Sequence, residues 1–515
     1  MTVADVVFAR LGSRRALLTL SSILFLTFLD TTIMSVALED LQLTLHTTVS
    51  ELQWIVNAYA LLFAALMLAF GALGDRLGRR RVMLAGVTVF VAGSVFGALA
   101  PNTESLIAAR GIMGIGAAAC EPGTLSILRH LYPDRRDRAR ALGLWAAIAG
   151  LALAMGPVLG GILVGVGGWR AIFWFNLAAG VLAFAGAAAA VPESSDPQTG
   201  RFDFGGFFLG PLALGTIVFA IIVGETAGYG AAHVIALFAV GIAAGALFAF
   251  VELRSKAPML DVRYFRKTPF SGSLFVAFAT YFGVFSIFFL TALYLQVVLG
   301  YTAYKTATLF VPMAVAMIIA SSFAGRWVAK VGPRLPVAVG CLAAGAGVLL
   351  TDLALRGSAS YTPLILSLAL AGIGFGIAVV PITSVALSIL PARHSGMAAS
   401  ATTTSREVGT VVGVAALGSL FNTQLINYLT ERLVELGVPE EFRDLIITSV
   451  LTGQAPVGAA EAQAQYGDVV TKVISAAYDA VHSGVSISLL VAGCVILLSG
   501  VVAWLTFSLD RLTLD

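Results

Sequence analysis

Long apolar runs, separated by short charged or glycine-rich stretches, dominate the hydropathy pattern of the chain. A helix needs about 20 mostly apolar residues to cross the hydrocarbon core of a bilayer. Runs of that length predict fourteen membrane-spanning helices, at residues 15–38, 51–73, 81–100, 105–128, 139–164, 169–191, 206–224, 232–253, 270–298, 305–329, 336–355, 361–385, 398–421 and 484–507.

The charged stretch GALGDRLGRRR, at residues 71–81, orients these spans. Its charge density excludes it from the bilayer core, so we predict a short loop at the membrane surface. Short loops rich in Lys and Arg stay in the cytoplasm. With this loop inside, both termini lie inside, and 23 of the 31 Lys and Arg residues fall on cytoplasmic segments.

Composition supports a membrane protein and excludes several other classes. Charged residues make up 11% of the chain, against about a quarter in soluble domains. The net charge of +3 is too small to indicate a nucleic-acid partner. The chain has no phosphate-binding loop, and its histidines and cysteines lack metal-ligand spacing. We therefore expect neither an enzyme, nor ATP-driven transport, nor a metal site.

A weak internal repeat suggests duplication. The stretch GRWVAKVGPR, at 325–334, repeats the seven-residue glycine spacing of residues 71–81 and also follows a predicted span. Ala329 stands where the first copy has Asp75, so only the first copy carries the acid. If the seventh and eighth spans are an insertion, each copy follows the second span of a six-span half.

The predicted organisation is a six-helix bundle at 1–191, two inserted helices with cytoplasmic linkers at 192–269, and a second six-helix bundle at 270–515. The second bundle includes an extracytoplasmic loop at 422–483, which contains helical patterning around a small, polar middle. We favour a tolerated surface insertion over a lid for this loop. Transporters built from two such halves bind substrate between the halves near the bilayer middle.

Several motifs occur in a fixed order on the predicted spans. They are GALGDRLGRRRVML from residue 71, LDTTIMSVAL at 29–38, ARGIMGIGAA at 109–118, MGPVLGG at 155–161, WRAIFWFNLAAG at 169–180, FDFGG at 202–206, PMLDVRYF at 258–265 and SGMAASATTTSREVGTVVG at 395–413. Together they resemble the fourteen-span drug:proton antiporters of the major facilitator superfamily, across nearly the whole chain.

The resemblance implies an all-α polytopic membrane protein with the major facilitator fold, two six-helix bundles plus two inserted helices. It implies a proton-coupled antiporter that exports hydrophobic or cationic small molecules from the bacterial cytoplasmic membrane by alternating access. Protons are then the coupling ion, with no other cofactor, and the protein is a monomer surrounded by lipids. A lipid or lipid-precursor flippase on the same fold remains open, as does a non-transporting sensor or subunit.

Ionisable residues within the spans are the candidate proton-coupling groups, because charge in the bilayer is costly and marks function. Asp30 lies about 21 Å into its span at 1.5 Å per residue. It either exchanges a proton or hydrogen-bonds Thr31 or Thr32. Arg110 and Glu121 share one stripe of a single predicted helix, and the resemblance implies that Arg110 takes part in proton coupling. Glu121 is either a second proton site or a selectivity residue.

The predicted substrate cavity combines aromatic and polar side chains of several spans. Aromatic residues recur at helical spacing in the ninth span, where packing or lipid contact is the favoured alternative to lining a cavity. Exposed to the cavity, they would suit cationic or amphipathic compounds. The cavity residues we predict are Trp54, Asn57, Glu121, Phe282, Phe285, Phe289 and Gln296.

Small residues and the charged loop are the predicted moving parts. Glycines and a proline in the fifth span permit close helix approach and a kink, which suits an interface that rocks. The resemblance implies the same role. Arg406 could snorkel to the cytoplasmic interface, and the resemblance favours a structural role for it over a catalytic one. The latch and hinge residues we predict are Gly71, Asp75, Arg76, Gly78, Arg79, Gly156, Pro157, Gly160, Gly161 and Arg406.

Overall fold

The computed structural model describes residues 3–132, 134–195, 203–255, 258–356, 361–390, 395–452 and 459–507. Helices account for almost all of these residues, and the described ranges contain no strand. The first half comprises α1 (Val3–Ile33), η1 (Met34–Val36), α2 (Leu38–Leu45), α3 (Val49–Leu77), α4 (Arg79–Ala98), α5 (Thr103–Leu131), α6 (Arg135–Gly167) and α7 (Arg170–Ala190). The remainder comprises α8 (Phe204–Ala227), α9 (Ala232–Arg254), η2 (Val262–Arg266), α10 (Thr268–Leu293), η3 (Tyr294–Val298), α11 (Ala303–Val331), α12 (Arg334–Arg356), α13 (Tyr361–Ile389), α14 (Ser395–Glu435), α15 (Glu440–Thr452) and α16 (Ala459–Thr506).

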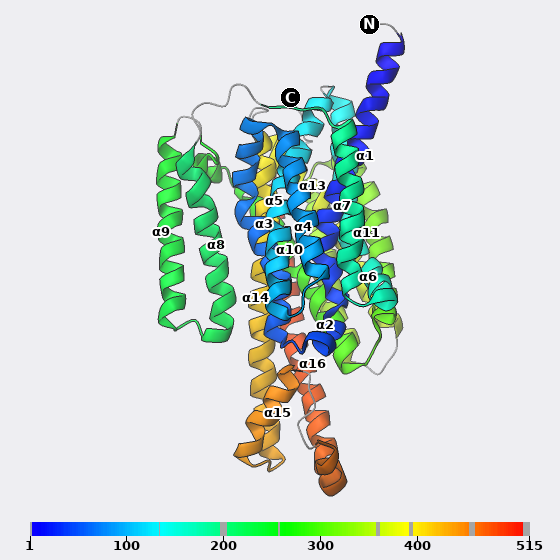
Figure 1. The fold of residues 1–515 in the computed structure, drawn as a ribbon, viewed down its shortest axis with the longest axis vertical. Helices are drawn as coiled ribbons and strands as arrows, with labels where there is room; N and C mark the ends of the chain where they lie inside the picture. Colours follow the sequence, from blue (N-terminus) through cyan, green and yellow to red (C-terminus); the bar gives the residue numbers. More distant parts are fainter. Residues whose placement is uncertain are drawn as a thin grey trace.

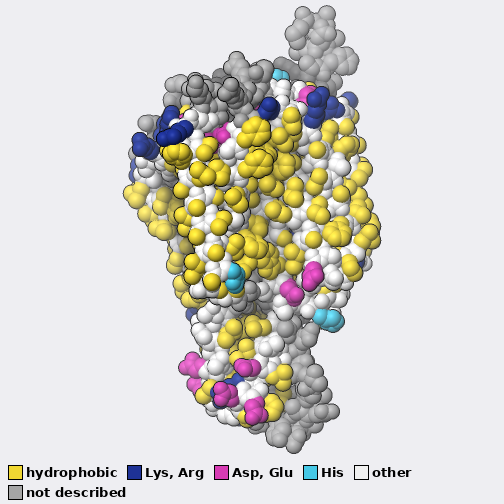
Figure 2. All heavy atoms as spheres, turned by 60° about the vertical axis from the view of Figure 1, so that its left-hand side comes forward, with side chains coloured by type: hydrophobic (Ala, Val, Ile, Leu, Met, Phe, Trp, Pro, Cys, Tyr) yellow, Lys and Arg dark blue, Asp and Glu magenta, His cyan; other side chains and the backbone are white. Residues whose placement is uncertain are grey.

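Fourteen helices in the described ranges are long and apolar enough to cross a membrane, which confirms the predicted number of spans. They form one upright bundle, and α1 begins at the same end where the chain finishes (Figure 1). We call this end the terminal end and the opposite one the distal end. Lys and Arg side chains gather near the terminal end, and Asp and Glu side chains gather at the distal end (Figure 2).

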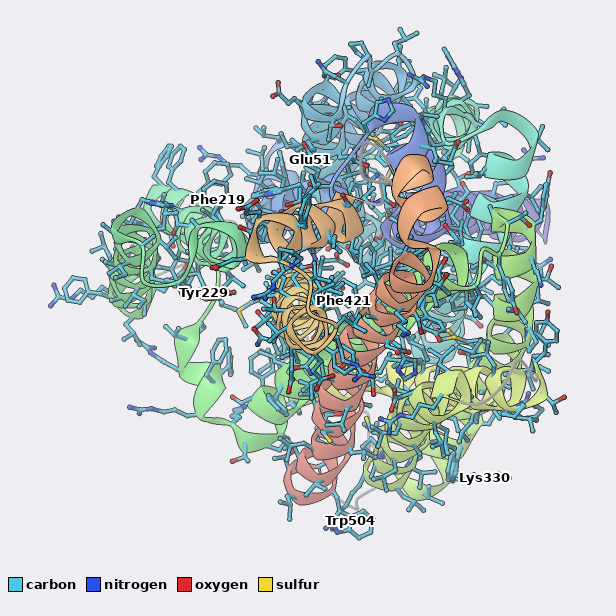
Figure 3. All side chains as sticks on the ribbon, turned by 90° about the horizontal axis from the view of Figure 1, so that it is seen from below. Glu51, Phe219, Tyr229, Lys330, Phe421 and Trp504 are labelled. Carbon is cyan, nitrogen blue, oxygen red and sulfur yellow. The ribbon has the colours of Figure 1, made fainter. Side chains whose placement is uncertain are left out.

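Two long helix pairs join the first half to the second. α3 packs along α14, and α6 packs along α11. The inserted hairpin of α8 and α9 stands at the side of the bundle (Figure 1), where α8 contacts α3 and α14. Seen from the distal end, Phe421 of α14 lies near the centre of the bundle, and Phe219 lies to one side, on α8 of the inserted hairpin (Figure 3). The joint between the halves is therefore the natural place for a site.

The predicted loop at 71–81 is almost entirely helical, which corrects that expectation. α3 runs to Leu77 and α4 starts at Arg79, so only Gly78 interrupts the helices. Its φ of +108° is a conformation that side chains with a Cβ rarely adopt. Gly332 makes the same break between α11 and α12, with φ of +79°. The repeat seen in the sequence therefore corresponds to two equivalent helix junctions.

The predicted loop at 422–483 is also largely helical. α14 has 41 residues and α16 has 48, so at 1.5 Å per residue they measure about 60 and 70 Å, twice the bilayer core. Both continue beyond the other spans at the distal end (Figure 1), where α14 packs with α15. An apolar stripe explains this, because Leu425, Leu429 and Leu433 recur every four residues and are buried. Residues 453–458, in the polar middle, lie outside the described ranges.

Candidate functional site

A buried ion pair lies between α1 and α5. Asp30 and Arg110 are both fully buried, and the Arg110 Nη1 donates to Asp30 Oδ2. Asn176 of α7 donates to the other carboxylate oxygen, with 2.6 Å between Nδ2 and Oδ1. Each charge thus has a partner, as a buried ion requires. The structure brings together two of the three predicted proton-coupling residues and adds Asn176.

Arg110 is held in place by further contacts within the first half. Its Nε donates to the Ile55 carbonyl oxygen at 3.0 Å. Its guanidinium lies over the Tyr59 ring, with 4.6 Å between Cζ and the ring centroid. The Tyr59 hydroxyl in turn donates to the Thr27 carbonyl oxygen at 2.8 Å. These contacts fix the guanidinium beside Asp30, so protonation of Asp30 would leave a buried cation without its counter-ion.

The second charge cluster crosses the joint between the halves. Glu121 lies on α5, eleven residues or about 16 Å along the helix from Arg110. It is 3% exposed and interacts electrostatically with Arg406 of α14, and neither of its carboxylate oxygens has a hydrogen-bond partner among the described residues. The shared stripe of α5 therefore serves two separate clusters, one with α1 and one with α14.

Arg406 lies in the protein interior and does not snorkel to the membrane surface, one of the positions that the sequence allowed. It is 1% exposed, and its Nη2 donates to the Val379 carbonyl oxygen at 3.4 Å. Its guanidinium lies 5.4 Å from the centroid of the Tyr281 ring. The physical reason is that α13 and α10 cover this face of α14 and that Glu121 supplies an opposite charge.

Sequence reasoning did not select Glu407, which belongs to the same cluster. It is fully buried and interacts electrostatically with Glu121 and Arg406. Neither carboxylate oxygen has a hydrogen-bond partner among the described residues. Its position could have identified it as a candidate, because Glu407 is an acid inside the predicted span at 398–421. The cluster combines two carboxylates with one guanidinium, so one negative charge is in excess when both acids are ionised.

Other buried polar groups lie on the helices that surround this cluster. Asn57 of α3 is fully buried, and neither polar atom of its side chain has a hydrogen-bond partner in the described part of the chain. The same holds for the Tyr281 hydroxyl on α10 and the Thr404 hydroxyl on α14. Buried polar atoms are normally satisfied by protein, water or ligand. Each of these groups can therefore hydrogen-bond to a water or to a bound molecule.

The other predicted cavity residues lie elsewhere. Trp54 packs on Phe219 of the inserted hairpin, with 5.6 Å between ring centroids. Phe282 and Phe289 are buried inside the bundle and do not face lipid. The side chain of Phe285 lies outside the described part of the structure. The aromatic stripe is thus packed at both described positions.

Gln296 joins the two halves near the distal end. Its Nε2 donates to the Val36 carbonyl oxygen at 3.3 Å, and its Oε1 accepts from the Glu39 amide at 3.4 Å. Partial burial, followed by the adjacent Asp40, raises the pKa of Glu39. Both polar atoms of Gln296 are therefore engaged by the protein in this conformation.

The predicted hinge glycines of α6 lie at close helix contacts. A Cβ built on Gly160 would lie 2.6 Å from the Ile33 carbonyl oxygen, and one on Gly161 would lie 2.7 Å from the Ala303 carbonyl oxygen. Gly156 contacts the same helix as Gly160, beside Thr32. Pro157 lies between them inside α6. Gly156 and Gly160 thus allow close packing of α6 against α1 and η1, and Gly161 allows close packing of α6 against α11 of the other half.

The predicted latch at the terminal end also contacts the other half. A Cβ on Gly71 would lie 3.4 Å from the Ser400 hydroxyl oxygen of α14. Asp75 pairs with Arg79, with 2.8 Å between the Arg79 Nη2 and the carboxylate. Arg76 lies one residue further along α3, in its last turn.

Glu193, which sequence reasoning missed, binds the start of α4. Its Oε1 accepts from the Arg80 amide at 3.1 Å, and a Cβ on Gly78 would lie 2.7 Å from the same oxygen. A carboxylate at a helix N-terminus is favourable because the amides there lack helix partners. Gly78, which has no Cβ, thus leaves room for an acid that follows α7.

Comparison with known proteins agrees with this architecture. The Major Facilitator Superfamily matches residues 20–414. The chain is 32% identical over 494 residues to the multidrug resistance protein Stp of Mycobacterium tuberculosis, covering 95% of this chain and 90% of that protein. It is 31% identical to the multidrug efflux pump LfrA of Mycolicibacterium smegmatis, covering 96% of both chains.

Solved structures share the fold at low sequence identity. A bacterial homologue of the human lysosomal transporter Spinster, in an inward-facing and unoccupied conformation, gives a TM-score of 0.63 at 18% identity and covers 96% of this chain and 98% of its own. The human organic anion transporter MFSD10 gives 0.58 at 15% identity, with coverage of 95% and 99%. With its fourteen spans, two joined halves and buried charges at the joint, the chain belongs to the major facilitator superfamily.

Proposed function

We propose that this protein is a proton-coupled exporter of hydrophobic or cationic small molecules, acting in a bacterial cytoplasmic membrane. Relatives named as multidrug efflux and antibiotic resistance proteins support drug export. The family and fold are those of a transporter rather than an enzyme. The observation that carries the coupling is the excess of one buried negative charge in the cluster of Glu121, Arg406 and Glu407.

Charge balance explains how a proton and a substrate compete in this cluster. Two buried carboxylates beside one guanidinium are costly when both are ionised. A proton on Glu121 or Glu407 removes the excess charge, and so does a cationic drug. Both cannot be accommodated at once without a surplus of positive charge, so binding of one expels the other. Tyr281, whose ring centroid lies 5.4 Å from the Arg406 guanidinium, supplies a hydroxyl beside the cluster.

Asp30 and Arg110 form the second part of the proposed mechanism. In the structure the pair is closed, and Asp30 is charge-balanced. A proton that reaches Asp30 would cancel this attraction and release Arg110 toward other partners. The two clusters lie on one helix, α5, so a shift of α5 couples them. We propose that protonation at Asp30 and at Glu121 occurs in alternating conformations.

We further propose that the terminal end is cytoplasmic, because Lys and Arg gather there (Figure 2). The protein then acts as a monomer among membrane lipids, with protons as its coupling ion. Cysteines introduced at the exposed positions Thr448 and Lys330 would label from opposite sides of intact cells. Labelling of Lys330→Cys from outside the cell would show that the terminal end is extracytoplasmic and that the proposed orientation is wrong.

Proton release on drug binding tests the proposal directly. A lipophilic cation is added to the purified protein in weakly buffered detergent solution, and a pH indicator measures the protons that are released. We expect release from the wild type and at least a tenfold smaller signal from the E121Q/E407Q variant, which has no acid left in the cluster. The exposed-acid variant E104Q is the matched control. Cation binding without proton release, across the pH range in which the protein is stable, would refute the coupling.

A further inference from the structure

Two carboxyl groups meet at the terminal end of the inserted hairpin, away from the central clusters. Asp203 caps α8, since its Oδ1 accepts from the Gly206 amide at 2.8 Å. Glu252 lies in the last turn of α9 and is 2% exposed. Its Oε2 accepts from the Leu260 amide at 3.3 Å. One oxygen of each acid thus accepts a hydrogen bond from a backbone amide.

The second oxygen of each acid is directed at the other acid. A Cβ built on Gly206 would lie 2.5 Å from Glu252 Oε1 and 2.9 Å from Asp203 Oδ2, so both oxygens converge beside this glycine. Neither oxygen has a hydrogen-bond partner in the described ranges. Ionised carboxylates only accept hydrogen bonds. With both acids ionised, a buried oxygen would face a like charge and remain unsatisfied.

We propose that Asp203 and Glu252 form a proton-binding site in which the two carboxyl groups share one proton. One acid then carries an O–H that donates to the facing oxygen of the other, and both oxygens are satisfied. The pair keeps a single negative charge, which the backbone amides of Gly206 and Leu260 stabilise. This site goes beyond the proposed export mechanism, because no residue of the central clusters belongs to it.

The basic side chains near this pair have other partners. The Arg263 Nη2 donates to the Leu253 carbonyl oxygen at 3.1 Å. The Arg254 guanidinium lies over the Phe250 ring, 4.1 Å from its centroid. Asp261, in the linker between α9 and α10, accepts from the Arg263 amide through its Oδ1. The Lys267 ammonium, further along this linker, lies 5.1 Å from the centroid of the Tyr264 ring. Arg201 and Lys256 lie outside the described ranges. Among the described residues, Arg254 and Arg263 are thus engaged elsewhere, and we assign the charge that neutralises the pair to a proton.

The proton site fastens a linker that reaches both halves of the transporter. The Leu260 side chain is buried in a small apolar cluster at the terminal end. Its other members come from α3, α10, α14 and the residue that follows α13: Leu68, Phe270, Leu274, Leu390, Ala398 and Ala401. The next residue, Asp261, donates its amide to the Met397 sulphur at 3.1 Å. While the proton is bound, Glu252 holds this linker to the hairpin. As pH rises and the proton leaves, repulsion between the carboxylates loosens the hold.

Infrared difference spectroscopy of the full-length protein in detergent tests for the shared proton. We expect the wild type minus E252Q spectrum at neutral pH to contain the C=O stretch of a protonated carboxyl group, and the wild type minus E104Q spectrum to lack it. The amide of E252Q can donate to Asp203, so this variant keeps the fold. D203N should remove the same band, because the asparagine amide donates to Glu252 in place of the shared proton. The asparagine still caps α8, so this variant also keeps the fold. Absence of the band from both difference spectra would overturn the proposal.

Hydrogen exchange of the Leu260 amide tests the consequence. After correction for intrinsic exchange, we expect protection in the wild type to fall about tenfold between about pH 6 and about pH 9, the effect of one lost hydrogen bond. Protection in E252Q should not change over this range. Equal pH dependence in both proteins would overturn the role of the pair, as would dependence on added sodium ions instead of on pH. Neither experiment measures transport, so failure here leaves the export mechanism standing.

Discussion

Substitution of Asp30 by asparagine isolates the contribution of the buried ion pair. The change is nearly isosteric, and the Asn176 amide can still donate to the new side-chain oxygen. Arg110 keeps its charge, however, and has no route to solvent because it is fully buried. Its Nη1 then faces a neutral amide in place of a carboxylate. The variant therefore carries an uncompensated charge inside the bundle.

The size of this effect follows from the burial of both partners. Removing one member of a buried pair typically costs about 3–5 kcal/mol, since the remaining ion stays desolvated. We expect D30N to lower the free energy of unfolding by that amount, measured by denaturant titration in detergent with tryptophan fluorescence. E104Q makes the same chemical change at an exposed site and should stay within about 0.5 kcal/mol of the wild type.

A second substitution separates folding from coupling. In D30N/R110Q both partners are neutral and can hydrogen-bond each other, so the double variant should recover about 1–3 kcal/mol relative to D30N. It should still fail to move drug against its gradient in proteoliposomes with an imposed proton gradient. Gradient-driven export by the double variant would refute the role of Asp30 in coupling. Wild-type stability of D30N would refute the ion pair itself.

Three further substitutions test other parts of the structure. Glu121→Gln should reduce export of cations about tenfold more than export of neutral drugs, since it removes a buried charge interaction; equal losses in a paired transport assay would contradict this. Gly161→Leu should collide with Ala303 across the halves and favour an open distal end, measured as faster labelling of a distal-side cysteine; unchanged labelling would count against the close contact. Glu193→Gln should weaken the start of α4 by about 0.5–2 kcal/mol and speed exchange of the Arg80 amide, and an unaltered exchange rate would exclude this cap.

The number and order of spans could be predicted from the sequence because each requires a long apolar run, and a run that long has few other uses. The ends of the helices could not. Helix geometry continues wherever an apolar stripe packs against a partner, so α14 extends to residues such as Leu433 that hydropathy assigns to a loop. α16 likewise begins well before its predicted span. The charged stretch at 71–81 is helical on both sides of Gly78, because this one glycine is enough to separate α3 from α4.

The site was predictable in part for a related physical reason. Asp30, Arg110 and Glu121 were identifiable because charge in an apolar span is costly and therefore rare. Their partners were not, since pairing depends on which helix faces lie against each other. Asn176 resembles any buried amide in the sequence, and Arg406 could reach the membrane surface as readily as the interior. Glu407 stands beside an arginine in the sequence, which conceals that both interact with Glu121 across the halves.

The two charge clusters differ in what a rocking motion does to them. Asp30, Arg110 and Asn176 all lie in the first half, so this cluster can survive when the halves separate. Glu121 lies in the first half but Arg406 and Glu407 lie in the second, so separation at this depth must break their interactions. The cost of separation then depends on whether a proton or a cation occupies the cluster, since either changes the attraction between the halves. In the proposed mechanism, occupancy is thereby tied to conformation through α5 and α14, the helices that carry this cluster.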